Sequence, residues 1–160
     1  MRLEYFQMID RVVDLDAAER RVRCRCNVPE TSPVFEGHFP TYPILPGVLL
    51  IECMAQTGGL LANALTGFAS LPILAAVKNA KFRAVVRPGD VLEFEAGIEH
   101  EGSGYTIADA IGSRDGAAIC EARLTYRLIP YPTEELRQKL LADAEKLNVA
   151  IKDFAKEFAR

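Results

Sequence analysis

Two side chains that can exchange protons lie close together in the sequence. His38 stands in the segment FEGHFPTYP, and Glu52 lies in the otherwise apolar run VLLIECMAQ. A buried carboxylate without a partner costs several kcal/mol, so such a group either has a partner or stays protonated. An imidazole base and a carboxyl acid in one segment suit the removal of a proton next to a carbonyl group.

Both residues also have simpler interpretations, since a loop histidine is often structural and a buried glutamate can belong to a structural network. Two features favour catalysis. Gln56 lies four residues after Glu52, so it shares a helix face and can orient the carboxyl group. Pro46 and Gly47 start the predicted helix, where the unpaired amides of Gly47 and Val48 can polarise a carbonyl oxygen.

Other chemistries lack their usual signatures. The sequence has no nucleophile elbow and no glycine-rich phosphate loop. Two histidines and four cysteines without a CxxC pair do not suggest a zinc site, and we expect no metal and no cofactor. We expect the cysteines to be reduced and to act as small hydrophobic residues.

The elements that position this segment are a loop and a helix. Seven prolines and glycines between residues 29 and 47 predict a long ordered loop without regular structure. The apolar run predicts a helix over 48–66. It is long enough for a membrane span, but Glu52, Gln56 and the Gly58–Gly59 pair favour a helix buried in a soluble protein.

Alternating apolar residues and turn motifs predict an antiparallel sheet. The expected strands cover 20–28, 72–78, 80–87, 91–99, 105–111 and 117–128, with turns at Pro88–Gly89–Asp90 and Asp115–Gly116. A helix that is apolar on all sides must be covered on all sides. We therefore predict an α+β domain, residues 1–130, in which a curved sheet wraps one long helix.

The remainder, residues 131–160, is predicted to be a helical extension beginning after Thr133 and reaching residue 158. Its apolar stripe consists of Leu140, Ala144, Leu147, Ile151, Phe154 and Phe158. We favour packing on the sheet or on a second subunit over a lid or a carrier-docking role.

Composition narrows the class of protein. The chain has 160 residues, 49% of them hydrophobic and 26% charged, which suits one globular domain. Its net charge of −3 gives no general basic field for nucleic acid. The N-terminus MRLEYFQMID lacks the apolar stretch of a secretory signal, and we expect a cytoplasmic protein.

The run GHFPTYPILPGVLLIECMAQTGG resembles the FabA/FabZ class of 3-hydroxyacyl-acyl-carrier-protein dehydratases, and the resemblance covers roughly residues 3–130. It implies a hotdog fold and dehydration of (3R)-3-hydroxyacyl-acyl-carrier-protein to the trans-2-enoyl product in fatty acid biosynthesis. It also implies that His38 takes the C2 proton, Glu52 protonates the departing hydroxyl, Gly47 donates its amide to the thioester carbonyl, and Gln56 positions the acid. Glutamate at position 52, in place of aspartate, resembles the branch that dehydrates without isomerising.

In this class the histidine and the carboxylate of one site come from different subunits, which implies a homodimer or a trimer of dimers. We expect the substrate site to be lined by Phe39, Tyr42, Pro46 and Val48. A basic cluster is expected to dock the acidic carrier protein: Lys78, Lys81, Arg83 and Arg87. The last three share parity and would face one side of a regular strand, although a solvated strand face is the simpler interpretation.

The sequence departs from the class pattern at three places. Thr41 and Tyr42 replace a glycine and a small polar residue, Lys78 replaces an aspartate, and the C-terminal helix extends past the usual end. The opening LEYFQMIDRV resembles a subgroup that serves the very-long-chain acyl groups of bacterial lipid A. Two rival functions are a hotdog acyl thioesterase, which uses a carboxylate to activate water, and a non-catalytic acyl-binding module. The sequence leaves open the acyl chain length and the pathway that the enzyme serves.

Overall fold

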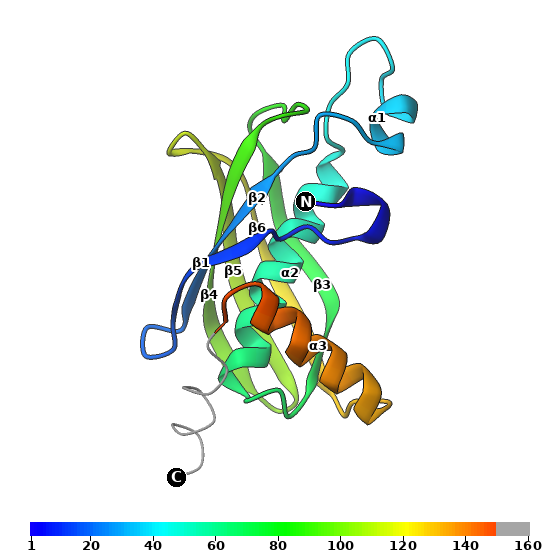
Figure 1. The fold of residues 1–160 in the computed structure, drawn as a ribbon. Coiled ribbons are helices and arrows are strands. Elements are labelled where there is room, and N and C mark those ends of the chain that lie inside the picture. The colour runs from blue at the N-terminus through cyan, green and yellow to red at the C-terminus, as the bar shows by residue number, and fades with distance from the viewer. Residues whose placement is uncertain (150–160) are drawn as a thin grey trace.

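The computed structural model describes residues 1–149 of the chain (Figure 1). A short 3₁₀ turn, η1, covers Leu3–Tyr5. The strands are β1 (Arg11–Asp16), β2 (Arg21–Asn27), β3 (Leu71–Phe82), β4 (Val91–Gly102), β5 (Tyr105–Arg114) and β6 (Ala117–Ile129). The helices are α1 (Pro33–Gly37), α2 (Gly47–Leu65) and α3 (Glu134–Lys146).

One antiparallel sheet of order β1-β2-β4-β5-β6-β3 curves around α2 (Figure 1). Helix α2 packs against β2, β3, β4, β5 and β6. By length and composition α2 could cross a membrane, but 61% of its apolar window is buried inside the protein, which makes it the core helix. The predicted hotdog arrangement, with its helix displaced by one residue from the expected 48–66, is confirmed.

The turns follow the local chemistry that the sequence predicts. Asp115 and Gly116 have φ values of 52° and 78°, which is the left-handed pair of a tight hairpin turn. Gly89 has φ +82° in the predicted turn before β4. Strand β1 was not predicted, because Val12 is its one buried residue and the apolar alternation is therefore absent.

Two predicted boundaries are wrong. The loop over 29–47 contains the helix α1, which begins where Ser32 accepts a hydrogen bond from Val34 N and Pro33 occupies the first turn. The separate strands over 72–78 and 80–87 are one strand, β3, which has an irregularity around Asn79 and ends at Phe82. Residues 83–87 then leave the strand and run beside the loop after His38, where Leu45 N donates to Val86 O at 2.8 Å.

Helix α3 crosses in front of α2 in the view of Figure 1, and its Arg137 Nε donates to Phe68 O, just beyond the end of α2, at 2.9 Å. Thr133 caps it as predicted, accepting from Leu136 N, but the helix ends at Lys146, and residues 147–149 are not helical. The predicted continuous helix is therefore wrong at this point, where Asn148 adopts φ 69°. Ala144 is buried, and Leu140, Leu141 and Leu147 pack against the core. The described part of the apolar stripe thus packs on its own chain. The rest of the stripe, Ile151, Phe154 and Phe158, lies outside the described residues.

Candidate active site

Two backbone carbonyls hold His38, one through its own backbone N–H and one through its ring. It follows α1, and its backbone N–H donates to Val34 O at 2.9 Å. Its Nδ1 lies 2.9 Å from Ile44 O, and since a carbonyl only accepts, Nδ1 carries the proton in this contact. In the neutral ring, Nε2 is then left as the basic nitrogen. The Phe39 ring contacts the imidazole edge to face at 4.5 Å.

Glu52 lies in the second turn of α2 and is half-buried. Gln56, one turn further, donates from Nε2 to Glu52 Oε1 at 2.9 Å. The same Nε2 donates to Phe6 O at 2.6 Å, while Gln56 Oε1 accepts from Met8 N at 3.1 Å. Both ends of the amide are therefore committed, and its orientation toward Glu52 is fixed by the N-terminal segment.

The first turn of α2 presents backbone donors. Leu49 N turns back to Pro46 O, whereas the N–H groups of Gly47 and Val48 find no acceptor among residues 1–149. A side chain at position 47 would begin 3.4 Å from the Phe82 ring, so glycine keeps the helix start open between the ring and the backbone. Free amides at the positive end of a helix can stabilise a developing oxyanion.

Within one chain, the proposed acid and the proposed base do not contact each other through a hydrogen bond. His38 lies in the loop before α2, Glu52 lies on α2, and no hydrogen bond connects the two side chains. Of the expected substrate residues, Phe39, Tyr42 and Val48 are exposed by 57%, 51% and 69%, while Pro46 caps α2 and is half-buried. Large apolar side chains thus stay open to solvent beside the helix start.

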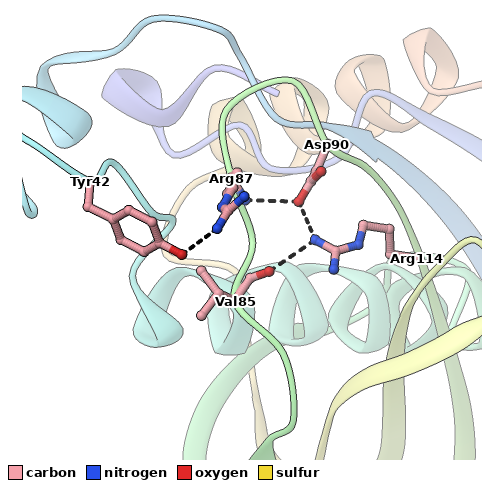
Figure 2. A pocket seen from close by; sticks show the side chains of 5 residues that line it. All are labelled: Tyr42, Val85, Arg87, Asp90 and Arg114. Atoms are coloured by element: carbon pink, nitrogen blue, oxygen red, sulfur yellow. Dashed lines mark hydrogen bonds and ion pairs between the residues drawn. The ribbon is translucent and has the colours of Figure 1, made fainter.

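The four cations expected to dock a carrier protein have different partners in the structure. Lys81 and Arg83 both contact Glu121 Oε1, at 3.0 and 2.9 Å, and their hydrogen bonds lower the pKa of that carboxyl. Because β3 ends at Phe82, the predicted shared side is wrong for Arg87, which instead donates to the Tyr42 hydroxyl (Figure 2). Lys78 is exposed on β3.

Several contributors to this region were not predicted. Phe82 covers the start of α2, and the backbone of Phe6 and Met8 holds Gln56. Arg114, Arg87 and Tyr42 together line a hollow. Backbone contacts carry no side-chain signature in a sequence. The alternation of Phe82 with its neighbours could have indicated an apolar residue beside the helix, but not which element it faces.

The four cysteines are free and buried, as expected. Burial raises the pKa of the Cys24 thiol to about 12 and that of the Cys120 thiol to about 11. These two thiols are therefore protonated at neutral pH and are poor nucleophiles. The residues described contain no group of histidine, cysteine and carboxylate side chains able to hold a metal ion.

Comparison with known proteins places this chain in a family. A family model described as a FabA-like domain matches residues 2–123. The chain belongs to the FabA-like family. A 3-hydroxyacyl-(acyl-carrier-protein) dehydratase FabZ from Latilactobacillus sakei is 42% identical over 120 residues, 74% of this chain and 85% of that one. The protein of the same name from Clostridium acetobutylicum is 40% identical over 123 residues, 76% and 86% of the two chains.

Solved structures share the fold of this FabA-like chain. AziG from S. sahachiroi superposes with a TM-score of 0.63 at 14% identity, covering 80% of this chain and 95% of its own. A variant of a thioesterase from Pseudomonas aeruginosa gives a TM-score of 0.61 at 18% identity, covering 79% and 84%. Identities this low establish the hotdog fold alone. Helix α3 lies beyond the residues that the family model matches.

Proposed function

We propose that this protein removes water from a (3R)-3-hydroxyacyl thioester on acyl carrier protein, forming the trans-2-enoyl thioester in fatty acid biosynthesis. The observation that carries the proposal is the 42% identity over 120 residues with a chain named as such a dehydratase. The solved structures named as thioesterases share far less sequence and support only the fold.

His38 acts as the base in this proposal. The Ile44 carbonyl occupies Nδ1, so the lone pair of Nε2 can take a proton from C2 of the substrate. The backbone N–H groups of Gly47 and Val48 donate hydrogen bonds to the thioester carbonyl oxygen and stabilise the negative charge that develops when the C2–H bond breaks.

Glu52 acts as the acid. Its Oε1 is held by Gln56, so the protonated carboxyl can present its other oxygen to the C3 hydroxyl. As the C3–O bond breaks, the proton of Glu52 passes to the departing oxygen, water leaves, and the C2–C3 double bond forms. The proton gained by His38 and the proton lost by Glu52 balance over one turnover.

We further propose a homodimer in which His38 and Glu52 of one site come from different subunits. Strand β3 is an edge strand, paired on one side with β6, and an unpaired edge invites another strand. Its apolar side chains are exposed by between 36% and 47%: Ile73, Leu74, Val77 and Phe82. A second copy covering this edge would remove these side chains from water and bring its own residues to the helix start.

The expected partner is an acidic acyl carrier protein, and the expected compartment is the cytoplasm. Lys78, Lys81, Arg83 and Arg87 are proposed to contact the carrier. Lys81 and Arg83 share Glu121, so their net contribution to a basic surface is one charge. Arg87 lies apart from them, beside Tyr42.

One assay separates the rival functions. The purified protein is incubated with 3-hydroxybutyryl-carrier protein, and both the enoyl product and the free carrier thiol are measured by mass spectrometry. A dehydratase forms the enoyl thioester, which is lighter than the substrate by the mass of one water. Release of free thiol without dehydration would identify a thioesterase. If neither product forms, the protein is an acyl-binding module.

A further inference from the structure

A hollow of about 530 Å³ lies beside the loop that carries His38 (Figure 2). Its lining comes from three parts of the chain that are distant in sequence. Tyr42 belongs to the loop before α2, Arg114 ends β5, and the connection between β3 and β4 supplies Val85, Arg87 and Asp90. The hydrogen bond from Leu45 N to Val86 O joins the loop to the connection. The loop that carries His38 is therefore attached to the segment that lines the hollow.

Arg87 is oriented by Tyr42. The guanidinium Nη2 donates to the Tyr42 hydroxyl, and the guanidinium carbon lies 5.0 Å from the centre of the tyrosine ring. The Arg87 backbone N–H donates to Asp90 Oδ2 at 2.9 Å, which fixes the turn below the side chain.

Arg114 is oriented by two acceptors. Its Nη1 donates to Val85 O at 3.0 Å and to Asp90 Oδ2 at 2.5 Å (Figure 2). Its Nε and Nη2 make no hydrogen bond to any residue of 1–149. A guanidinium held at one nitrogen keeps the rest of its planar fork for a ligand.

The charges that line the hollow sum to one positive charge, from two guanidinium groups and one carboxylate. Asp90 is engaged by Arg114 and by the Arg87 backbone, so its role is to position the two arginines. A tyrosine hydroxyl and two arginines around one hollow suit a phosphate ester, which offers several acceptor oxygens to such donors.

We propose that this hollow binds the phosphate of the pantetheine arm on which the carrier protein holds its acyl group. This inference rests on the proposed function, because the carrier-linked substrate of a dehydratase carries a phosphodiester on the same pantetheine arm as the thioester. Arg87 and Arg114 bind the phosphate oxygens, and Tyr42 positions Arg87. Lys81 and Arg83 are less suited, since both already share Glu121.

The test compares two small substrates that differ only in the phosphate: 3-hydroxybutyryl-pantetheine and 3-hydroxybutyryl-4′-phosphopantetheine. For the wild-type protein, the phosphate should lower KM by about tenfold or more, as charge-assisted hydrogen bonds do. Arg87→Gln and Arg114→Gln should each remove most of that advantage, raising KM for the phosphopantetheine substrate far more than KM for the pantetheine substrate. Tyr42→Phe, which keeps the exposed ring and removes the hydroxyl, should remove a smaller part.

Arg21→Gln is the matched control, because Arg21 pairs with Glu95 on an exposed part of the sheet, away from the hollow. It should leave KM for both substrates unchanged, and thermal melts check that every variant is folded. An equal KM for the two substrates with the wild-type protein would overturn the proposal. So would variants that lose activity equally on both.

Binding without turnover separates this inference from the proposed function. Calorimetric titration with free 4′-phosphopantetheine and with pantetheine should show tighter binding of the phosphate form, lost in Arg87→Gln and Arg114→Gln. Absent turnover of every thioester, with this binding intact, contradicts the dehydratase function and not the phosphate site. Tighter binding of 3-hydroxybutyryl-coenzyme A than of the phosphopantetheine thioester would show that the hollow selects a nucleotide end, and would overturn the carrier-arm assignment.

Discussion

Gln56 holds Glu52 through a hydrogen bond from its side-chain Nε2 to Glu52 Oε1 at 2.9 Å. The amide itself is clamped, since Phe6 O accepts from the same nitrogen and Met8 N donates to its oxygen. The N-terminal segment therefore determines the direction in which the proposed acid points. A segment remote from the helix in sequence thus belongs to the positioning of the acid.

Substitutions at Phe6 test this clamp, because Phe6 has φ 53°, a left-handed conformation that glycine adopts freely and proline cannot. Phe6→Pro should displace the Phe6 carbonyl and lower kcat by about tenfold or more, with a smaller effect on KM, as misplaced catalytic groups do. Phe6→Gly keeps the backbone conformation and should retain kcat. Equal kcat values in the two variants, both folded by circular dichroism, would show that the clamp does not position Glu52.

Alanine substitutions at the two adjacent glycines of α2 should have different effects on the free energy of unfolding. A Cβ at Gly58 would lie 2.6 Å from the Tyr126 hydroxyl, which is fixed by its bond to Ala55 O, whereas a Cβ at Gly59 would find its nearest neighbour at 3.7 Å. Gly58→Ala should cost about 1–3 kcal/mol of unfolding free energy by overpacking. Gly59→Ala should be neutral or stabilise the helix by up to about 1 kcal/mol.

Urea unfolding of both glycine variants checks this prediction, and Tyr126→Phe supplies the control. Removing the hydroxyl relieves the closest contact of the Gly58→Ala methyl group, so the double variant should lose less stability than the sum of its single changes. Additive losses would mean that the tyrosine does not limit the space at position 58.

The cross-strand pair of Asp109 and Arg123 should make stability depend on pH at the acid end. Its hydrogen bonds at 2.7 and 2.5 Å lower the pKa of the Asp109 carboxyl. Because the pKa of Asp109 is lowered in the folded state, the ion pair stabilises the protein at pH values above the unfolded aspartate pKa of about 3.9. That stabilisation is lost as the pH falls through the folded-state pKa. Asp109→Asn should therefore be slightly less stable than wild type at neutral pH, the difference being small because the pair is exposed.

Urea midpoints measured at neutral pH and at steps below pH 4 or so follow the gap between Asp109→Asn and wild type. The gap should close as the pH falls. A gap that stays constant over this range would show that the effect of the substitution does not come from the ionised carboxylate.

Mixing two inactive variants tests whether the site is shared between subunits. If His38 and Glu52 of one site come from different chains, His38→Ala and Glu52→Gln homodimers have no complete site, and each mixed dimer has one. Free subunit exchange should then restore up to about a quarter of wild-type activity. Failure to recover activity, with exchange demonstrated by native mass spectrometry, would place both groups of a site in one chain.

The strong local patterns of the sequence predict most of the fold. The apolar run after Pro46 predicts α2, and Asp115–Gly116 predicts its hairpin, because both signals are local. Helix α1 was missed because Ser32 and Pro33 start a helix within a region otherwise full of helix breakers. The contact of Arg114 with Asp90 spans 24 residues and two strands, and periodicity carries no information about such pairings.

The rate of enoyl formation from 3-hydroxybutyryl-carrier protein by Glu52→Gln, compared with the wild-type protein, tests the central claim most directly. Glutamine keeps the size of the side chain and a hydrogen-bond acceptor for Gln56 but cannot donate the acid's proton. The proposed mechanism predicts that kcat falls by roughly 10²–10⁴-fold while the melting temperature is little changed. Wild-type kcat in a folded Glu52→Gln protein would contradict the assignment of Glu52 as the acid and, with it, the proposed mechanism.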